Sequence, residues 1–440
     1  MQEFIKAAAR VKPSKRQLDW YDTEFYAFVH FTVNTYTDLE WGLGNEDEKI
    51  FNPYDLNCDE WVEAVKSAGM KGLILTAKHH DGFCLWPTST TMHSVKSSPW
   101  KNGQGDVVKE CAEACRRGGI KFGVYLSPWD RNASCYGTDA YNDFYCTQLT
   151  ELLTNYGELF MVWFDGACGE GPNGRKQNYD FDRYNALVRK YQPNAVIFND
   201  FGPDVRWCGN EAGSARRAEW AVVPSELCCR SEVQTGPSPM AGDVSFLHNT
   251  EENIGDLFHI LHSKGLVFTG AEIDMSIRPG WFWHEKEEPH SLERLWNTYL
   301  NSCGGNTSFN LNVPPMPSGR IDPRDIVRLR ELGEKIENSI GEQKKVPCRV
   351  EKTWSAGGQA KYDIILDQPE NIRYISIMED LTEGQRIEAF RLLNGDVIYR
   401  GYTVGHHKIC QVHTYGDRIT LFITGARDEA VLRDISVYKE

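Results

Sequence analysis

Apolar residues in the first three quarters of the chain fall into short runs separated by longer amphipathic segments. Helical periodicity fills the first gaps between the runs, as in Cys58–Ala68 and Val107–Arg117. The runs have the length and composition of buried strands: Phe25–Phe31, Gly72–Ala77, Ile120–Leu126, Leu159–Phe164, Ala195–Asn199, Ala218–Val223 and Leu266–Thr269. Alternating strands and helices predict parallel βαβ units. Seven or eight such units between residues 24 and 340 favour an α/β fold of the (β/α)8-like barrel type.

The pattern changes near residue 344, where long helical periodicity stops. Short segments of alternating polarity follow, among them Ile387–Leu393 and Arg418–Ile423, separated by turn signals such as Asn394-Gly395-Asp396. We therefore expect a barrel domain over residues 1–343 and a β-sandwich over residues 344–440. The sandwich is expected to buttress the barrel, because the sequence offers no aromatic platform that can be placed on its surface.

Composition excludes several classes of protein. A hydrophobic content of 41% excludes global disorder, and no GxGxxG motif follows the first strand, so a dinucleotide fold has no support. The net charge of −14 argues against nucleic acid or an anionic membrane as partner and fits a neutral substrate. The 13 cysteines are scattered without a CxxC pair, and Cys228 and Cys229 are adjacent. With no apolar segment at the N-terminus, we expect a reduced, cytoplasmic protein.

The run Leu159–Phe164 ends abruptly in Asp165 and Gly166. A strand that ends in this way places a carboxylate at the mouth of an α/β core, here beside Trp163. Enzymes that cleave sugars need a carboxylate aimed at the anomeric carbon and an aromatic wall against the ring. An aspartate that caps the following helix is an equally good interpretation of this motif alone.

Polar and aromatic residues also follow the other predicted strands, and in a barrel these ends converge on one site. The candidates are His30, the segment Leu39–Gly42, His79 and His80, Tyr125, Trp163 with Asp165, and the segment Arg206–Glu211.

The histidine doublet His79-His80 allows three interpretations. Neighbours on a strand point to opposite faces, so the pair is a poor metal chelate unless the strand has already become a loop. The pair fits better as two neutral imidazoles that contact sugar hydroxyls, because each can donate and accept a hydrogen bond. A pair satisfied within the core is the third possibility, and the sequence calls for no metal and no organic cofactor.

Taken together, these motifs resemble those of the α-L-fucosidases of glycoside hydrolase family 29. The resemblance covers residues 20–340, and the sandwich agrees with it. It rests on several independent motifs in the family's order and spacing: Ala77–Phe83, Trp86–Thr88, His30, Glu40-Trp41, Tyr125 and Trp163–Gly166.

The resemblance implies a retaining hydrolase that removes terminal α-linked L-fucose from an oligosaccharide or glycoconjugate. It implies that Asp165 is the nucleophile and that Tyr125 and Trp163 shape the pocket. The ring hydroxyls would be bound by His30, Glu40, His79 and His80, with Trp41 assisting.

The acid/base residue is not kept at one alignable place in this family, so three candidates stay open: Glu211, Glu226 and Glu272. Glu211 is expected, because Trp207–Glu211 resembles the acid/base loop of one branch of the family. The segment Gly270–Phe282 resembles the same branch, which prefers fucose α-1,3- or α-1,4-linked to GlcNAc in Lewis-type chains.

The branch resemblance adds Trp207, Arg278 and Trp281 as substrate-binding residues, with Arg206 as the alternative arginine. The loops Trp207–Glu211 and Arg278–Phe282 are expected to lie beyond strands four and six, beside the leaving-group subsite.

Three other functions stay open. A fucosidase of broad linkage preference differs only in specificity. A metal-dependent amidohydrolase would use His79, His80 and Asp165, but the HxH pattern of that class is missing. A fucose lectin would have kept the pocket without the chemistry, which the acids at Asp165 and Glu211 argue against.

Overall fold

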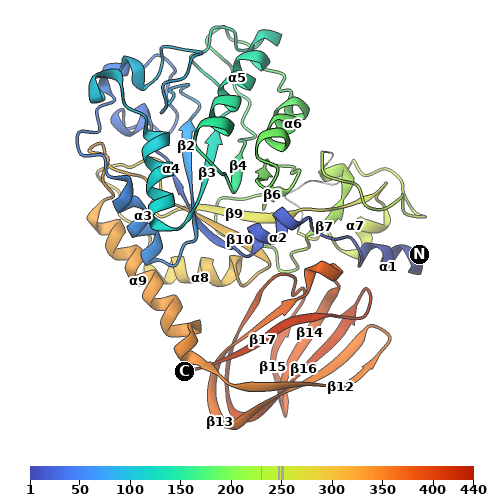
Figure 1. The fold of residues 1–440 in the computed structure, drawn as a ribbon. Helices are drawn as coiled ribbons and strands as arrows, with labels where there is room; N and C mark the ends of the chain where they lie inside the picture. Colours follow the sequence, from blue (N-terminus) through green and yellow to red (C-terminus); the bar gives the residue numbers. More distant parts are fainter. Residues whose placement is uncertain (229, 246–247, 249–251) are drawn as a thin grey trace.

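Parallel strands in the first three quarters of the chain close into a barrel (Figure 1). The computed structural model describes residues 1–228, 230–245, 248 and 252–440, so Cys229 lies outside the described residues. The barrel strands are β1 Phe25–Val29, β2 Gly72–Lys78, β3 Lys121–Leu126, β4 Met161–Trp163, β5 Val196–Phe198, β6 Val205–Trp207, β9 Gly270–Ser276 and β10 Thr307–Asn312. Their order around the barrel is β1-β10-β9-β6-β5-β4-β3-β2, which confirms the predicted fold class.

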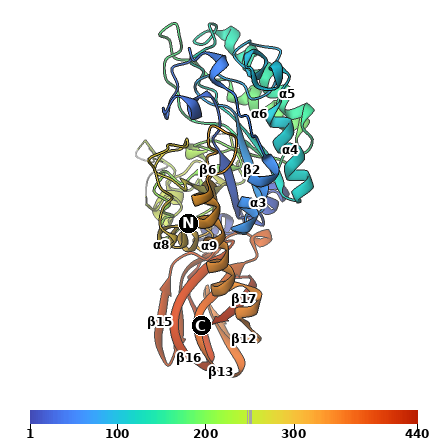
Figure 2. The same cartoon turned by 90° about the vertical axis from the view of Figure 1, so that its left-hand side faces the viewer.

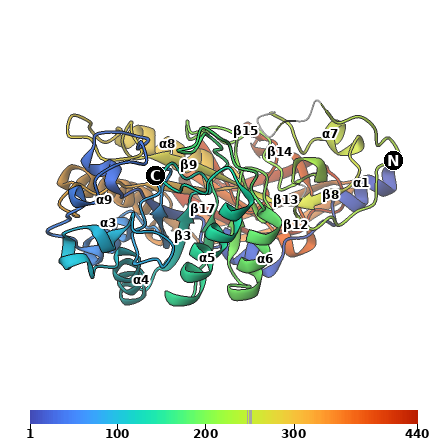
Figure 3. The ribbon, with the colours of Figure 1, turned by 90° about the horizontal axis from the view of Figure 1, so that it is seen from above.

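Helices pack around the outside of the barrel, and Figure 3 shows those that follow the first four strands along one side. They are α3 Cys58–Ser67, α4 Val107–Gly118, α5 Asp139–Asn155 and α6 Phe181–Tyr191, with α8 Leu292–Ser302 after β9 and α9 Pro323–Ile340 after β10. The side chains of Asn57, Asp106 and Asp180 cap α3, α4 and α6. The remaining helices are α1 Gln2–Ala8, α2 Lys15–Tyr21 and α7 Leu257–Leu261. None of the described helices has the length and apolar character needed to cross a membrane.

Two predicted strands do not belong to the barrel. The runs 218–223 and 266–269 contribute β7 (Val222–Pro224) and β8 (Leu266–Phe268), which pair with each other in a separate antiparallel sheet. The last three barrel strands are β6, β9 and β10, which the pattern of apolar runs did not reveal. The inward positions of β9 and β10 carry polar residues, as Glu272, Asp274 and Ser276 do on β9, so no continuous apolar run forms there. Strand β6 has only three residues, with Arg206 at its centre.

The C-terminal part is the predicted β-sandwich. Its strands are β11 Lys345–Val346, β12 Cys348–Ala356, β13 Gln359–Glu379, β14 Ile387–Asn394, β15 Asp396–Gly401, β16 Lys408–Ala426 and β17 Leu432–Lys439. The long strands β13 and β16 pair along most of their length, with irregularities in the register near Ile365 and Ile372. The predicted turn at residues 394–396 joins β14 to β15, and Gly395 adopts the positive φ of 72° that this tight connection requires.

The sandwich packs against one end of the barrel, as Figures 1 and 2 both show. Glu24, directly before β1, lies 2.5 Å from His407 Nδ1. Asn306, directly before β10, accepts a hydrogen bond from the His406 backbone N–H at 2.7 Å. These contacts hold the amino-terminal ends of β1 and β10, so the carboxyl ends of the barrel strands are left for a site.

Candidate active site

The carboxyl ends of the barrel strands surround a small cavity of about 180 Å³. Its walls come from β1, β3, β4, β9 and the loops that follow the strands. The lining residues are Phe28, His30, Trp41, His79, His80, Tyr125, Trp163, Asp165, Ala167, Glu211, Asp274 and Trp281. Most of the side chains predicted from the ends of the strands are therefore brought together here. Three predicted residues, Glu40, Trp207 and Arg278, do not line the cavity.

Asp165 follows β4 and is fixed from two sides. The Tyr125 hydroxyl donates to Asp165 Oδ2 at 2.9 Å, and the Ala167 backbone N–H donates to Oδ1 at 2.7 Å. His80 Nε2 lies 3.8 Å from Oδ2. The next helix, α6, is capped by Asp180, so Asp165 is not a helix cap. The carboxylate is thus held at a defined place in the cavity wall.

The three predicted histidines line the cavity together. Strand β2 ends at Lys78, so the strand alternation no longer applies to His79 and His80, and both reach the cavity. His30 Nδ1 donates to Asn312 Oδ1 at 2.9 Å, and His80 Nδ1 lies 2.7 Å from Ser127 Oγ. The buried His79 Nδ1 has no hydrogen-bond partner among the described residues.

Burial sets the charge state of these imidazoles. It lowers the pKa of His30 to about 4 and lowers the pKa of His79 well below its ordinary value. Burial also lowers the pKa of His80, against the opposing effect of Asp165. Near pH 7 the cavity therefore presents neutral imidazoles. The single N–H of His30 is used toward Asn312, and that of His80 toward Ser127, whose hydroxyl donates to the Trp129 carbonyl, so the Nε2 atoms of both are acceptors for a hydroxyl group.

Aromatic rings form the rest of the wall. Phe28 meets Trp163 edge to face at a centroid distance of 4.9 Å, and His30 lies 5.1 Å from the Trp281 ring. Trp163 stacks on Phe198 at 4.0 Å, which fixes its plane. Trp41 stands at the mouth of the cavity and is 58% exposed. A compact ligand would thus meet both hydrogen-bonding groups and aromatic rings in the wall.

Glu211 reaches the cavity from the loop that follows β6. Partial burial raises its pKa, an interaction with Trp281 opposes the rise, and the nearby charges of Asp165 and Glu40 add to it. Trp281 lies in the loop after β9. In chain order these loops follow the sixth and seventh barrel strands, so their assignment to strands four and six was wrong. Residues of β6 had been taken for part of a loop, and β9 had not been recognised as a strand.

The other two acid/base candidates lie outside the cavity lining. Glu272 is buried in the barrel, where it accepts from Trp163 Nε1 at 2.8 Å and Asn310 Nδ2 at 3.1 Å. Burial raises its pKa to about 7. Glu226 holds a surface turn by accepting from Ser263 Oγ at 2.9 Å and from the Lys264 backbone N–H. Of the three candidates, Glu211 alone lines the cavity.

Glu40 joins two loops instead of facing the cavity. It accepts from the Trp281 backbone N–H at 2.7 Å and from the Phe282 N–H at 3.2 Å, and His284 Nε2 lies 2.6 Å away. His284 Nδ1 lies 2.5 Å from Asp38. We call Asp38, Glu40 and His284 the loop clasp. Partial burial lowers the pKa of His284, but its hydrogen bonds to the carboxylates of Asp38 and Glu40 outweigh burial and raise the pKa above its ordinary value.

Neither candidate arginine lines the cavity. Arg278 is buried, with Nε 2.8 Å from Asp325 and Nη2 2.9 Å from Asp322. Arg206 is buried and donates to Glu219 and, at 2.8 Å, to the Trp220 carbonyl. Both guanidinium groups are neutralised inside the protein, so the structure does not support Arg278 as a substrate ligand.

Asp274 lines the cavity but was missed at the sequence level. It comes from β9 and accepts from Trp207 Nε1 at 2.8 Å, which places Trp207 behind it. Burial, with the charges of Glu272 and Glu211, raises the pKa of Asp274 well above its ordinary value. Asp200, after β5, also went unnoticed; burial and the charge of Asp165 raise its pKa to about 6. The alternation of Glu272, Asp274 and Ser276 was the signal that could have revealed Asp274.

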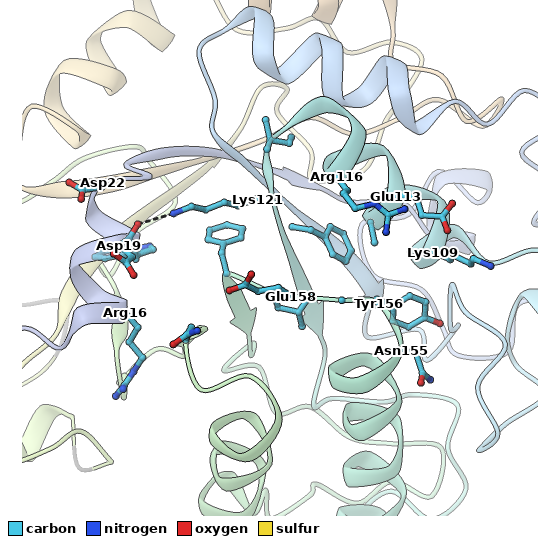
Figure 4. A pocket seen from close by; sticks show the side chains of 18 residues that line it. Arg16, Asp19, Asp22, Lys109, Glu113, Arg116, Lys121, Asn155, Tyr156 and Glu158 are labelled. Atoms are coloured by element: carbon cyan, nitrogen blue, oxygen red, sulfur yellow. Dashed lines mark hydrogen bonds between the residues drawn. The ribbon is translucent and has the colours of Figure 1, made fainter.

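A larger cavity of about 600 Å³ lies at the opposite face of the barrel (Figure 4). It is lined by α2, α4 and the residues that precede β3 and β4, with mixed charges such as Arg16, Lys109, Glu113 and Glu158. The amino-terminal face of a barrel serves stability, whereas catalytic side chains gather at the carboxyl ends of the strands. The smaller cavity is therefore the candidate active site.

Comparison with known proteins gives one consistent family. The family model described as alpha-L-fucosidase matches residues 7–221. The chain is 38% identical to "Alpha-L-fucosidase 1" of Arabidopsis thaliana over 97% of this chain and 87% of that protein.

Two solved structures support the same relationship over nearly the whole chain. A glycoside hydrolase 29 family member from an unknown rumen bacterium matches with a TM-score of 0.84 and 36% identity, covering 98% of this chain and 78% of that one. A glycoside hydrolase 29 fucosidase of Ruminococcus gnavus, solved in complex with fucose, matches with a TM-score of 0.81 and 29% identity, covering 98% and 95%.

Proposed function

The chain belongs to the α-L-fucosidases of glycoside hydrolase family 29, and from this membership we propose that it releases terminal L-fucose by a retaining double displacement. The observation that carries the proposal is that Asp165 and Glu211 line one small cavity together with neutral imidazoles. A retaining glycosidase needs one carboxylate as nucleophile and a second carboxyl group as acid and then base.

In the first step Asp165 attacks the anomeric carbon of fucose while the bond to the leaving oxygen breaks. Glu211 gives its proton to that oxygen, and its raised pKa favours the protonated form that this step requires. In the second step the Glu211 carboxylate takes a proton from water. The water oxygen attacks the anomeric carbon, the ester bond to Asp165 breaks, and fucose leaves with its original configuration.

The cavity wall supplies recognition. His30, His79 and His80 are proposed to hydrogen-bond the ring hydroxyls as neutral imidazoles. His30 and His80 would accept through Nε2, because their Nδ1 atoms donate to Asn312 and Ser127. Trp163 and Trp281 offer aromatic faces to the C–H bonds and methyl group of a 6-deoxy sugar. The volume of about 180 Å³ suits a single monosaccharide, so we propose exo-acting cleavage.

We further propose a preference for fucose α-1,3- or α-1,4-linked to the GlcNAc of Lewis-type chains. The resemblance of the segments around Glu211 and Trp281 to that branch of the family supports it, and both residues meet at the cavity. Trp41, exposed at the mouth, offers a surface for the rest of a branched glycan. An enzyme of broad linkage preference is the alternative.

Hydrolysis of an aryl α-L-fucoside, a Lewis-type trisaccharide and an α-1,2-fucosylated trisaccharide tests these proposals. We expect the Lewis-type substrate to give the highest kcat/KM, and proton NMR of the first product to show the α-anomer. A β-anomer would overturn the retaining mechanism, and a preference for the α-1,2 substrate would overturn the linkage. Loss of activity with a chelator would favour metal-dependent hydrolysis, and binding without turnover would favour a lectin.

A further inference from the structure

A row of cationic and aromatic side chains crosses the sandwich from one edge strand to the other. In the strand registers Trp354 of β12 lies opposite Lys361 of β13, and Lys361 lies opposite Phe422 of β16. Phe422 lies opposite Arg391 of β14, which in turn faces Arg400 of β15. Neighbouring strands are about 4.8 Å apart, so the row spans roughly 19 Å. We call these five residues the cross-strand row.

The row lies on the solvent face of the sheet. Its strand neighbours Tyr362, Leu392 and Leu421 are buried in the sandwich core, and successive side chains on a strand point to opposite faces. Trp354 is 42% exposed. Its ring centroid lies 6.4 Å from that of Phe422, and the Lys361 ammonium lies 5.1 Å above the Phe422 ring. Trp354, Lys361 and Phe422 are therefore in contact, and the strand register places Arg391 and Arg400 next to them on the same face.

The cations of the row lack carboxylate partners among the described residues, whereas nearby cations of the sandwich have them. Within the part of the chain that the structure describes, no ion pair involves Lys361, Arg391 or Arg400, although Lys352 pairs with Glu429 and Arg418 with Asp363. Like charges directly opposite each other on adjacent strands are destabilising. In a chain of net charge −14, two facing arginines and a nearby lysine without carboxylates create a local demand for an anion.

We propose that the cross-strand row binds an acidic polysaccharide. Guanidinium forks match sulfate and carboxylate groups, and the exposed Trp354 face suits a sugar ring. The linear arrangement suits an extended chain. A polyphosphate fits less well, since it carries no sugar ring to pack on the exposed Trp354 face.

The proposed site is separate from the fucose cavity. The sandwich contacts the amino-terminal ends of β1 and β10, and none of the five row residues lines the cavity. Binding there would hold a glycan polymer on the enzyme while the cavity stays open. The inference thus goes beyond the proposed function and does not depend on its linkage or mechanism.

Native affinity electrophoresis tests it, with chondroitin sulfate, neutral dextran or single-stranded DNA covalently immobilised in the gel. We expect chondroitin sulfate to retard the protein, dextran to leave it unchanged and added salt to weaken the effect. The double variant Arg391→Gln/Arg400→Gln should bind at least about tenfold more weakly, since each charge-assisted hydrogen bond lost is worth that much. Trp354→Ala should also weaken binding, although the charge is unchanged.

The matched control is Arg116→Gln/Arg330→Gln, which removes the same charge from exposed positions on α4 and α9. It should bind as the unchanged protein does, and all variants should hydrolyse the aryl fucoside normally. Equal losses in the control, no retardation by chondroitin sulfate, or stronger binding of DNA would overturn the proposal. An inactive protein that still binds chondroitin sulfate would refute the proposed function alone.

Discussion

At the scale of single residues, the two hydrogen bonds to Asp165 define what its replacement should do. Asp165→Asn keeps the shape of the side chain but cannot form the ester intermediate, so we expect turnover to fall more than about 10³-fold. The unfolding temperature should stay close to that of the unchanged protein. In Asp165→Gly, azide can attack the anomeric carbon from the face that the carboxylate has left, so it should give a fucosyl azide of inverted configuration. Kinetics on an aryl fucoside check this, and near-normal turnover in either variant would end the assignment.

The loss of activity on replacing Glu211 should depend on the leaving group of the substrate. Glu211→Ala should slow glycan hydrolysis by about 10²- to 10⁴-fold, which is the usual worth of general acid catalysis. An aryl fucoside with a good leaving group should lose less in its first step. Glu226→Ala serves as the control, because Glu226 lies in a surface turn outside the cavity lining. Similar losses in both variants would remove Glu211 from the mechanism.

Strand ends allowed Asp165, Tyr125 and the histidines to be predicted, because a parallel barrel brings all its carboxyl ends together. Glu40 and Arg278 could not be placed in this way. Glu40 bonds to a loop that lies more than 240 residues further along the chain, and Arg278 bonds to Asp325 from a helix that packs behind it. Which partner a charged side chain finds depends on tertiary packing, and no local spacing encodes it.

At the scale of elements, the loop clasp connects the loop of Trp41 with the loop of Trp281. Because the pKa of His284 is raised in the folded protein, protonation of this histidine stabilises the fold. This stabilisation is fully present below the pKa of about 6.5 that the histidine has in the unfolded chain. The contribution is lost as the pH rises through the higher folded value. Urea unfolding of the unchanged protein and of His284→Gln should therefore differ most at mildly acid pH and converge in alkali.

His284→Gln should change KM more than kcat, because the clasp positions the loops around the cavity. Loss of the clasp should raise KM for the aryl fucoside roughly tenfold below pH 7, since a charge-assisted hydrogen bond is lost. The control is His290→Gln in the same segment, because burial lowers the pKa of His290 and it lies outside the clasp. A KM that stays constant in His284→Gln would contradict a positioning role.

Barrel strands with apolar runs were predictable to within a few residues, as Gly72–Lys78 is. Strands β9 and β10 were not, because they alternate polar and apolar residues, and their polar sides face the cavity or a hydrogen-bond network inside the barrel. The runs 218–223 and 266–269 were apolar enough to resemble barrel strands. They instead pair with each other in a separate two-stranded sheet, where their side chains are buried.

At the scale of the whole molecule, Asn306 ties the barrel to the sandwich. Its φ is 67°, its side chain accepts from the His406 N–H, and it donates to the Glu219 carbonyl at 2.9 Å. Asn306→Ala should cost about 3 kcal/mol, from two lost hydrogen bonds and a backbone conformation that alanine disfavours.

Asn306→Gly separates these effects, because glycine tolerates the positive φ. It should lose about 1 kcal/mol less than the alanine variant in urea unfolding. Both should keep the kcat/KM of the folded enzyme, since Asn306 lies at the end of β10 remote from the cavity. A loss of activity in folded protein would show that the sandwich interface acts on the site.

The pairing of the first barrel strand with the last sets a delay during synthesis. Phe25 of β1 pairs with Phe309 of β10, and the partners that brace this junction, His406 and His407, come almost 100 residues later still. At the usual 5–20 residues per second, the edge of β1 waits roughly 14–57 s for its neighbour. During that time an apolar strand with one open edge stands on the ribosome, where it can pair with another nascent chain. The yield of folded enzyme should therefore depend on the speed of translation and on holdase chaperones.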